Sequence, residues 1–155
     1  MKNTALVAFC AAVLLTGCES VSSRVHERFT PVPPHTRVFA AEPKVVYDAA
    51  QQALKKVGLQ LGHKSFAAGS LDGYAAIRTG DNIRDARQTA IQIRLVGTEA
   101  GETRVELLVS DHTEGDFPGG VNKQDLREHS LYELYFAALQ QVLVERGGLK
   151  AAEKP

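Results

Sequence analysis

Apolar and polar positions alternate along residues 89–96 and again along residues 103–110. Alternation with a period of two is typical of strands that bury one face. The glycine-containing segment 97–102 between them predicts a hairpin loop. We therefore predict two neighbouring antiparallel strands with one apolar and one largely polar face. Two further extended segments, each interrupted by glycine, are expected at 59–66 and 70–79.

Two helices are predicted from apolar residues that recur at helical spacing. The first runs over 43–57 with a narrow, alanine-rich stripe, and Gly58 ends it. The second is expected to begin with Asn122 as its N-cap and Asp125 in the place of a capping-box acid, and to end at Gly147. Its apolar face is broad and consists of Leu131, Leu134, Tyr135, Ala138, Leu139, Val142 and Leu143.

A short strand at 37–41 precedes the first helix, so the expected order is β-α-β-β-β-β-α. Sequential antiparallel strands with two helices predict an α+β fold, a two-layer sandwich in which a sheet of about five strands carries both helices on one face. The domain is expected to span 36–148, followed by a flexible tail at 149–155.

The first 17 residues have the composition of a signal peptide. One positive side chain, Lys2, precedes the uncharged segment 5–15. A membrane-spanning helix needs about 20 apolar residues, so this segment is too short for a permanent anchor.

Leu15-Thr16-Gly17-Cys18 resembles the lipobox of bacterial lipoproteins. The resemblance implies cleavage between Gly17 and Cys18 and attachment of acyl chains to Cys18, which anchors the protein to a lipid bilayer. The alternative is an ordinary secretory signal with a cysteine at its cleavage site. In lipoproteins of this type an Asp after the cysteine is the familiar signal for the inner membrane, and Glu19 therefore favours the outer membrane, facing the periplasm.

Residues 18–35 are polar and end in prolines, which predicts an extended tether between lipid and domain. Cleavage removes Cys10, and lipidation occupies the Cys18 sulfur, so the mature protein has no thiol for a disulfide, for catalysis or for a metal.

Charge and motifs argue against several classes of function. The chain has 18 Lys+Arg and 18 Asp+Glu, without the basic excess that nucleic-acid binding favours. No cofactor motif is present, and no two of the five histidines have zinc-ligand spacing. The acidic cluster Asp111, His112, Glu114 and Asp116 lacks the full pattern of a calcium loop, so neither a cofactor nor a metal is expected.

Ser110-Asp111-His112 contains the residue types of a hydrolase, but neighbouring strand positions point to opposite faces. The three side chains are therefore not expected to form a relay. No catalytic residues are predicted, and the protein is expected not to be an enzyme.

Two features are candidates for binding a partner. Phe117 lies between Asp116 and Pro118 in a polar loop, where it can anchor a partner or fold back onto the core. The second candidate is the polar face of the sheet, with the alternative that it is a solvent face carrying ion pairs. Its residues are Gln92, Arg94, Arg104 and Glu106.

The layout resembles small uncharacterised bacterial lipoproteins with domains of unknown function. Two features carry this resemblance: the lipobox, and the helix Pro-Lys-Val-Val-Tyr-Asp-Ala-Ala-Gln-Gln-Ala-Leu-Lys-Lys-Val-Gly at 43–58. The element order is similar to the helix-grip domains of BamC, a lipoprotein of the outer-membrane assembly machinery. This resemblance bears on the fold, because a shared fold does not carry a shared activity. From the location and shape of the protein we predict a non-enzymatic interaction or accessory module, with another envelope protein as partner. The alternatives are a carrier that holds a small apolar ligand between sheet and final helix and, less favoured, a hydrolase.

Overall fold

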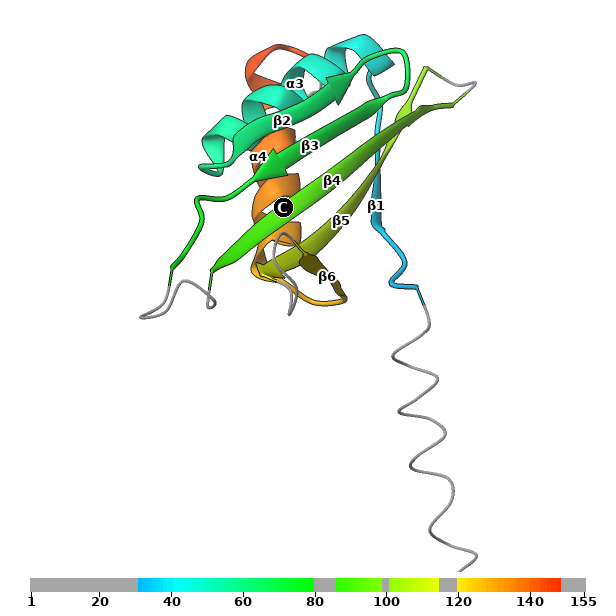
Figure 1. Ribbon diagram of the computed structural model, residues 1–155. Helices are drawn as coiled ribbons and strands as arrows, with labels where there is room; N and C mark the ends of the chain where they lie inside the picture. The colour runs from blue at the N-terminus through cyan, green and yellow to red at the C-terminus, as the bar shows by residue number, and fades with distance from the viewer. Residues whose placement is uncertain (1–30, 80–85, 99–100, 115–119, 149–155) are drawn as a thin grey trace, which may run out of the picture. The chain divides into compact units, whose positions relative to one another are not determined.

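The computed structural model describes residues 31–79, 86–98, 101–114 and 120–148. Its strands form one six-stranded antiparallel sheet with both helices on the same face (Figure 1), which confirms the predicted α+β fold. In chain order the elements are β1 (His35–Phe39), α3 (Pro43–Lys56), β2 (Gln60–Ser65), β3 (Ser70–Tyr74), β4 (Arg87–Gly97), β5 (Thr103–Glu114), β6 (Val121–Leu126) and α4 (Ser130–Glu145).

The sheet has the order β1-β5-β4-β3-β2, and β6 also pairs with β5. Strands β2 to β5 form a meander, in which each strand pairs with the next along the chain. Strand β1 pairs with residues 103–107 of β5, and β6 pairs with residues 109–114. Two short strands therefore divide one edge of the long strand β5 between them.

The long hairpin of β4 and β5 places the predicted apolar face against the helices. Ile91 is paired with Val109 and Ile93 with Leu107, and all four side chains are buried. The alternation in the sequence is thus confirmed by the register, because directly paired residues point to the same face.

Helix α3 is narrow enough on its buried side to let α4 approach closely. Pro43 occupies the first turn, where its missing N–H costs nothing. Ala49, Ala50 and Ala53 are fully buried, and the Tyr135 hydroxyl of α4 lies 3.5 Å from the Ala50 carbonyl oxygen. The alanine stripe therefore packs against the second helix as well as against the sheet.

The prediction that Asn122 caps the second helix is wrong. Asn122 and Asp125 lie in β6, and α4 begins at Ser130 with His129 as its N-cap. The His129 Nδ1 accepts a hydrogen bond from the Leu131 N–H at 3.1 Å, so an imidazole caps the helix in place of the expected amide side chain.

The physical reason is the distribution of apolar residues. Between Asn122 and His129 only Leu126 is apolar, so a helix there would have little to bury. As a strand, the same residues pair with the outer edge of β5 and satisfy backbone groups that would otherwise lack partners. Pairing with the sheet edge therefore stabilises this segment more than a helix started by the local capping pattern would.

Large aromatic side chains fill the middle of the layer between sheet and helices. Tyr132, Tyr135 and Phe136 of α4 are at most 1% exposed. The Tyr132 ring also stacks on His35, with 3.7 Å between ring centroids. His35, which the sequence assigned to the end of the tether, is thus the first residue of β1.

No helix among the described residues has the length and apolar content to cross a bilayer.

Candidate functional site

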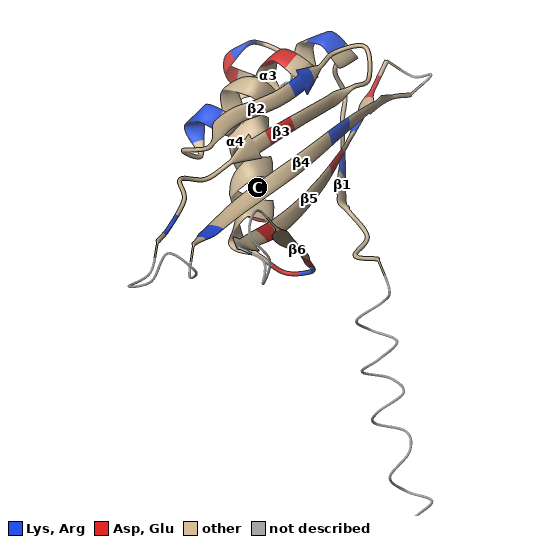
Figure 2. Ribbon diagram, viewed as in Figure 1, with Lys and Arg blue, Asp and Glu red and all other residues tan. Residues whose placement is uncertain are grey.

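The polar residues predicted on the sheet lie together on the face opposite the helices. In the register of β4 and β5, Arg94 is paired with Glu106, while Gln92 and Arg104 lie on the same side one pair away. Gln92, Arg94 and Arg104 are exposed, and Glu106 is half-buried. Figure 2 shows the charged positions along these strands, in a view in which the helices lie behind the sheet. We call this surface the uncovered sheet face.

Polar contacts on the uncovered sheet face are few. The Arg104 Nε lies 3.4 Å from the Glu106 Oε1 along the same strand, so this ion pair does not cross between strands as the alternative interpretation expected. The Lys123 Nζ of β6 donates to the Gln92 Oε1 at 3.0 Å. These contacts are partly exposed, and each contributes at most about 1 kcal/mol.

A hollow of about 370 Å³ lies on the same face. It brings three of the four predicted residues together with residues of β3 and of the segment before β1. Its lining consists of Pro34, Ala68, Ser70, Asp72, Gln92, Ile93, Arg94, Glu106 and Leu108.

The other predicted site residues lie outside the described part of the chain. These are Phe117, which follows β5 in the sequence, and Gly17 and Cys18 at the expected lipidation site. Cleavage, lipidation and the role of the aromatic loop residue stay predictions from the sequence.

The residues considered for a hydrolase fall on two faces of the sheet. Ser110 Oγ and His112 Nε2 are 3.2 Å apart on the uncovered sheet face, and Ser110 is only 1% exposed. Asp111 points to the helix side, where its carboxylate accepts from the Thr89 hydroxyl at 2.9 Å. The three consecutive side chains therefore do not form a relay.

The same separation bears on calcium binding. Asp111 and His112 point to opposite faces, so the two do not share one ion. Within the described ranges, no group of three or more His, Cys, Asp or Glu side chains is arranged to hold a metal ion.

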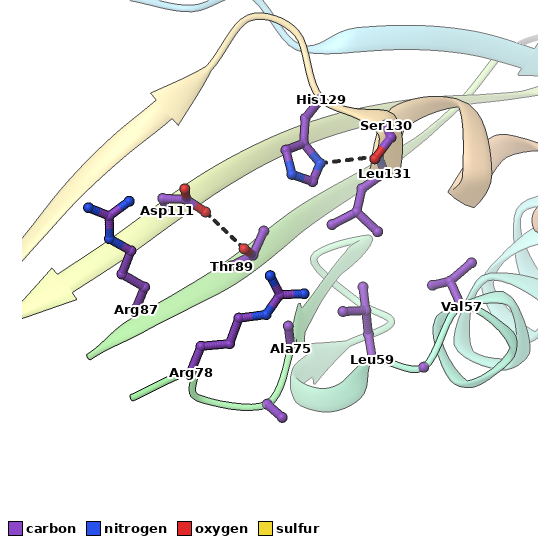
Figure 3. Close-up of a pocket in the computed structure, with 12 residues that line it drawn as sticks. Val57, Leu59, Ala75, Arg78, Arg87, Thr89, Asp111, His129, Ser130 and Leu131 are labelled. Atoms are coloured by element: carbon purple, nitrogen blue, oxygen red, sulfur yellow. Dashed lines mark hydrogen bonds between the residues drawn. The ribbon is translucent and has the colours of Figure 1, made fainter. Parts of the chain in front are cut away.

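The larger hollow, of about 550 Å³, lies at one end of the layer between sheet and helices. Five segments of the chain line it: the end of α3, the chain after β3, the first residues of β4, Asp111 of β5, and the start of α4 (Figure 3). We call it the end cavity. Its lining residues are Val57, Gly58, Leu59, Ala75, Ala76, Arg78, Arg87, Thr89, Asp111, His129, Ser130 and Leu131.

Sequence reasoning missed the two arginines of the end cavity. Arg87 is the first residue of β4. Arg78 pairs with it in an isolated bridge, each backbone N–H donating to the other carbonyl oxygen at 2.8 Å. The only signal for this pairing was the position of the two arginines on either side of a turn. Nothing local linked either residue to His129.

Comparison with known proteins adds little. No protein-family model matches the chain, and no curated protein matches it. Among solved structures the chain is similar to a DUF4468 family protein from Bacteroides ovatus, with 12% sequence identity and a TM-score of 0.35. The match covers 84% of this chain and 97% of that one. We draw no conclusion about family, fold or function from a likeness at this level, and the resemblance to BamC stays a prediction.

Proposed function

We propose that this protein is a lipid-anchored protein of the bacterial envelope, whose domain is a non-enzymatic module that binds another envelope protein through the uncovered sheet face. The anchor rests on the lipobox at Cys18, and Glu19 after it favours the outer membrane. One observation carries the binding surface: both helices lie on one side of the sheet, while the other side presents exposed polar residues around a hollow.

The composition of the uncovered sheet face suits a protein partner. Val38 and Val121 point to this side of the sheet, because they are paired with Arg104 and Glu114 of β5, and they are 54% and 65% exposed. Apolar side chains among charged ones are typical of the surfaces that recognise other proteins. The partly exposed Arg104–Glu106 pair adds little stability and can exchange for contacts with a partner.

The test is crosslinking in intact cells with a photoreactive amino acid at Arg94. The matched control carries the same probe at Gln140, an exposed position of α4 on the helix side. We expect one discrete adduct from the Arg94 position alone, and its loss when Arg104→Glu reverses a neighbouring charge. Equal adducts from both positions, or an adduct that Arg104→Glu leaves unchanged, would contradict binding at this face.

A second candidate function is the carrier, and the end cavity favours it. The space is comparable to sites that hold small molecules, which occupy about 300–1,000 Å³. It lies at the end of the layer, because aromatic side chains fill the middle. Its lining includes two arginines, so a purely apolar ligand fits only part of it.

A further inference from the structure

Arg78 and Arg87 line the end cavity, and Figure 3 shows the Arg87 guanidinium at its outer end, beside Asp111. Arg78 and Arg87 form one rung of backbone pairing, so their side chains leave the same side of this two-stranded segment. Figure 3 shows the Arg78 guanidinium reaching into the space between Thr89 and Leu59. The ion pairs found between described residues involve neither arginine.

Among the described residues of the lining, one acidic group faces these two cations. Asp111 is that group, and its carboxylate already accepts a hydrogen bond from Thr89. Two positive charges and one negative charge leave a positive excess in a recess, where the surrounding protein concentrates the field. This excess favours an anionic ligand over a neutral or cationic one.

The start of α4 adds donors to the same cavity. Because the His129 Nδ1 accepts from the Leu131 N–H, the proton of the neutral ring is on Nε2, which is a donor. Ser130 adds a hydroxyl group at the first position of this 16-residue helix. The positive end of the helix dipole reinforces the preference for an anion that the arginines set.

The opposite end of the cavity is apolar. Figure 3 shows Val57, Leu59 and Leu131 at one end, and Arg87 and Asp111 at the other. Ligand sites combine apolar walls with a few polar groups that fix orientation. The division of the lining therefore selects a molecule that has an acidic group at one end and an apolar body at the other.

We infer that the end cavity binds a small amphipathic organic anion. Its acidic group lies against Arg78, Arg87 and His129, and its hydrocarbon body lies against Val57 and Leu59. This inference deepens the carrier alternative by naming the class of ligand, and it is independent of partner binding at the uncovered sheet face.

Two fluorescent probes with the same aromatic body test it: 1-anilinonaphthalene-8-sulfonate, and N-phenyl-1-naphthylamine, which lacks the sulfonate. Each is titrated into the purified full chain carrying Cys18→Ser, which has no acyl chains of its own to bind the probes. We expect one saturable site for the sulfonate and affinity at least about tenfold lower for the neutral probe. Arg78→Gln and Arg87→Gln should each weaken sulfonate binding about tenfold and leave the neutral probe unchanged.

The matched control is Arg104→Gln, which removes an arginine from the uncovered sheet face and should leave both affinities unchanged. Raising the salt concentration should weaken the sulfonate alone, since screening acts on the charge. Thermal unfolding of each variant checks that the fold is intact.

Each contrary result overturns a defined part of the inference. Tight binding of the neutral probe, unaffected by Arg78→Gln or Arg87→Gln, would support the carrier function and overturn the preference for an anionic ligand. Failure of both probes to saturate up to about 1 mM would overturn the carrier as well. Equal weakening by Arg104→Gln would show that the anion does not bind in the end cavity.

Discussion

Two tyrosines of α4 carry hydroxyl groups into the core. The Tyr132 hydroxyl donates to the Leu126 carbonyl oxygen at 2.6 Å and accepts from the Val109 N–H at 3.0 Å, which ties β6 to β5. Tyr135 is fully buried, and burial raises its pKa above the usual value. The sequence placed Tyr135 on an apolar face, but the partners of these hydroxyls come from other elements and carry no local signal.

The burial of Tyr135 predicts that the domain loses stability at alkaline pH. The pKa of Tyr135 is raised in the folded state, so above about pH 10 the unfolded chain gives up a proton that the folded chain keeps. Below that pH, Tyr135 does not make the free energy of unfolding depend on pH. Above it, the free energy of unfolding falls by up to about 1.4 kcal/mol for each pH unit. Urea unfolding between about pH 8 and pH 11 should therefore show a steeper fall for the native chain than for Tyr135→Phe.

The stability of Tyr135→Phe should still fall somewhat at alkaline pH because of Tyr47. Burial raises the pKa of Tyr47 as well, and the charge of Asp48 adds a smaller effect. At neutral pH Tyr135→Phe should cost about 1 kcal/mol or less, since the bond to the Ala50 carbonyl is long. Identical slopes for the two proteins would show that Tyr135 ionises as easily in the folded chain as in the unfolded one.

At the scale of elements, the start of α4 depends on His129. Its side chain accepts from the Leu131 N–H, one of the groups that a helix N-terminus leaves without a partner. His129→Ala should lower the free energy of unfolding by about 1 kcal/mol, and His129→Asn should recover most of that loss. Urea unfolding at neutral pH measures both, with Glu128→Ala, the exposed neighbour, as the control. A loss no larger than that of Glu128→Ala would mean that the imidazole does not act as a cap.

The turn between β2 and β3 depends on Gly69. Its φ is 61°, and a Cβ added there would lie 2.4 Å from the Leu95 carbonyl oxygen, while the Leu95 N–H donates to the Gly69 carbonyl at 2.7 Å. Gly69→Ala must therefore move the turn away from the end of β4, and this displacement adds to the cost of the left-handed backbone.

Gly101→Ala is the matched control for that change. Gly101 has a φ of 71° with nothing within 4 Å of an added Cβ, so it isolates the backbone cost of about 1–2 kcal/mol. Gly69→Ala should cost at least about twice as much in thermal or urea unfolding. Equal losses in the two variants would show that contact with Leu95 does not constrain the turn.

For the molecule as a whole, the sequence predicted those features that depend on the pattern within one strand or one hairpin. Alternation placed Gln92 and Arg94 on one face, and the hairpin loop set β4 beside β5. Strand β6 and the start of α4 were missed because sheet pairing overrode a local pattern around Asn122. The end cavity could not be predicted, since five segments of the chain, between Val57 and Leu131, come together to line it.

Anchoring is the property that only the sequence supports, and Cys18→Ser tests it. Acyl chains hold a protein on a bilayer at about 0.8 kcal/mol per buried CH₂, and one chain alone binds only marginally. Without the thiol no chains are attached, so the protein should leave the membrane fraction on cell fractionation. Cys10→Ser is the control, because Cys10 lies in the segment that cleavage removes and anchoring should be unchanged.

Cys18→Ser also tests whether the domain folds and binds ligands independently of the lipid anchor. Cys18 lies before the domain that the sequence predicts at 36–148, so Cys18→Ser should unfold at the same temperature as the acylated protein and bind the two probes as proposed. Retention of Cys18→Ser in the membrane fraction after a high-salt wash would contradict the lipobox interpretation. If attachment were then through the domain, the exposed Val38 and Val121 on the uncovered sheet face would be the first positions to replace.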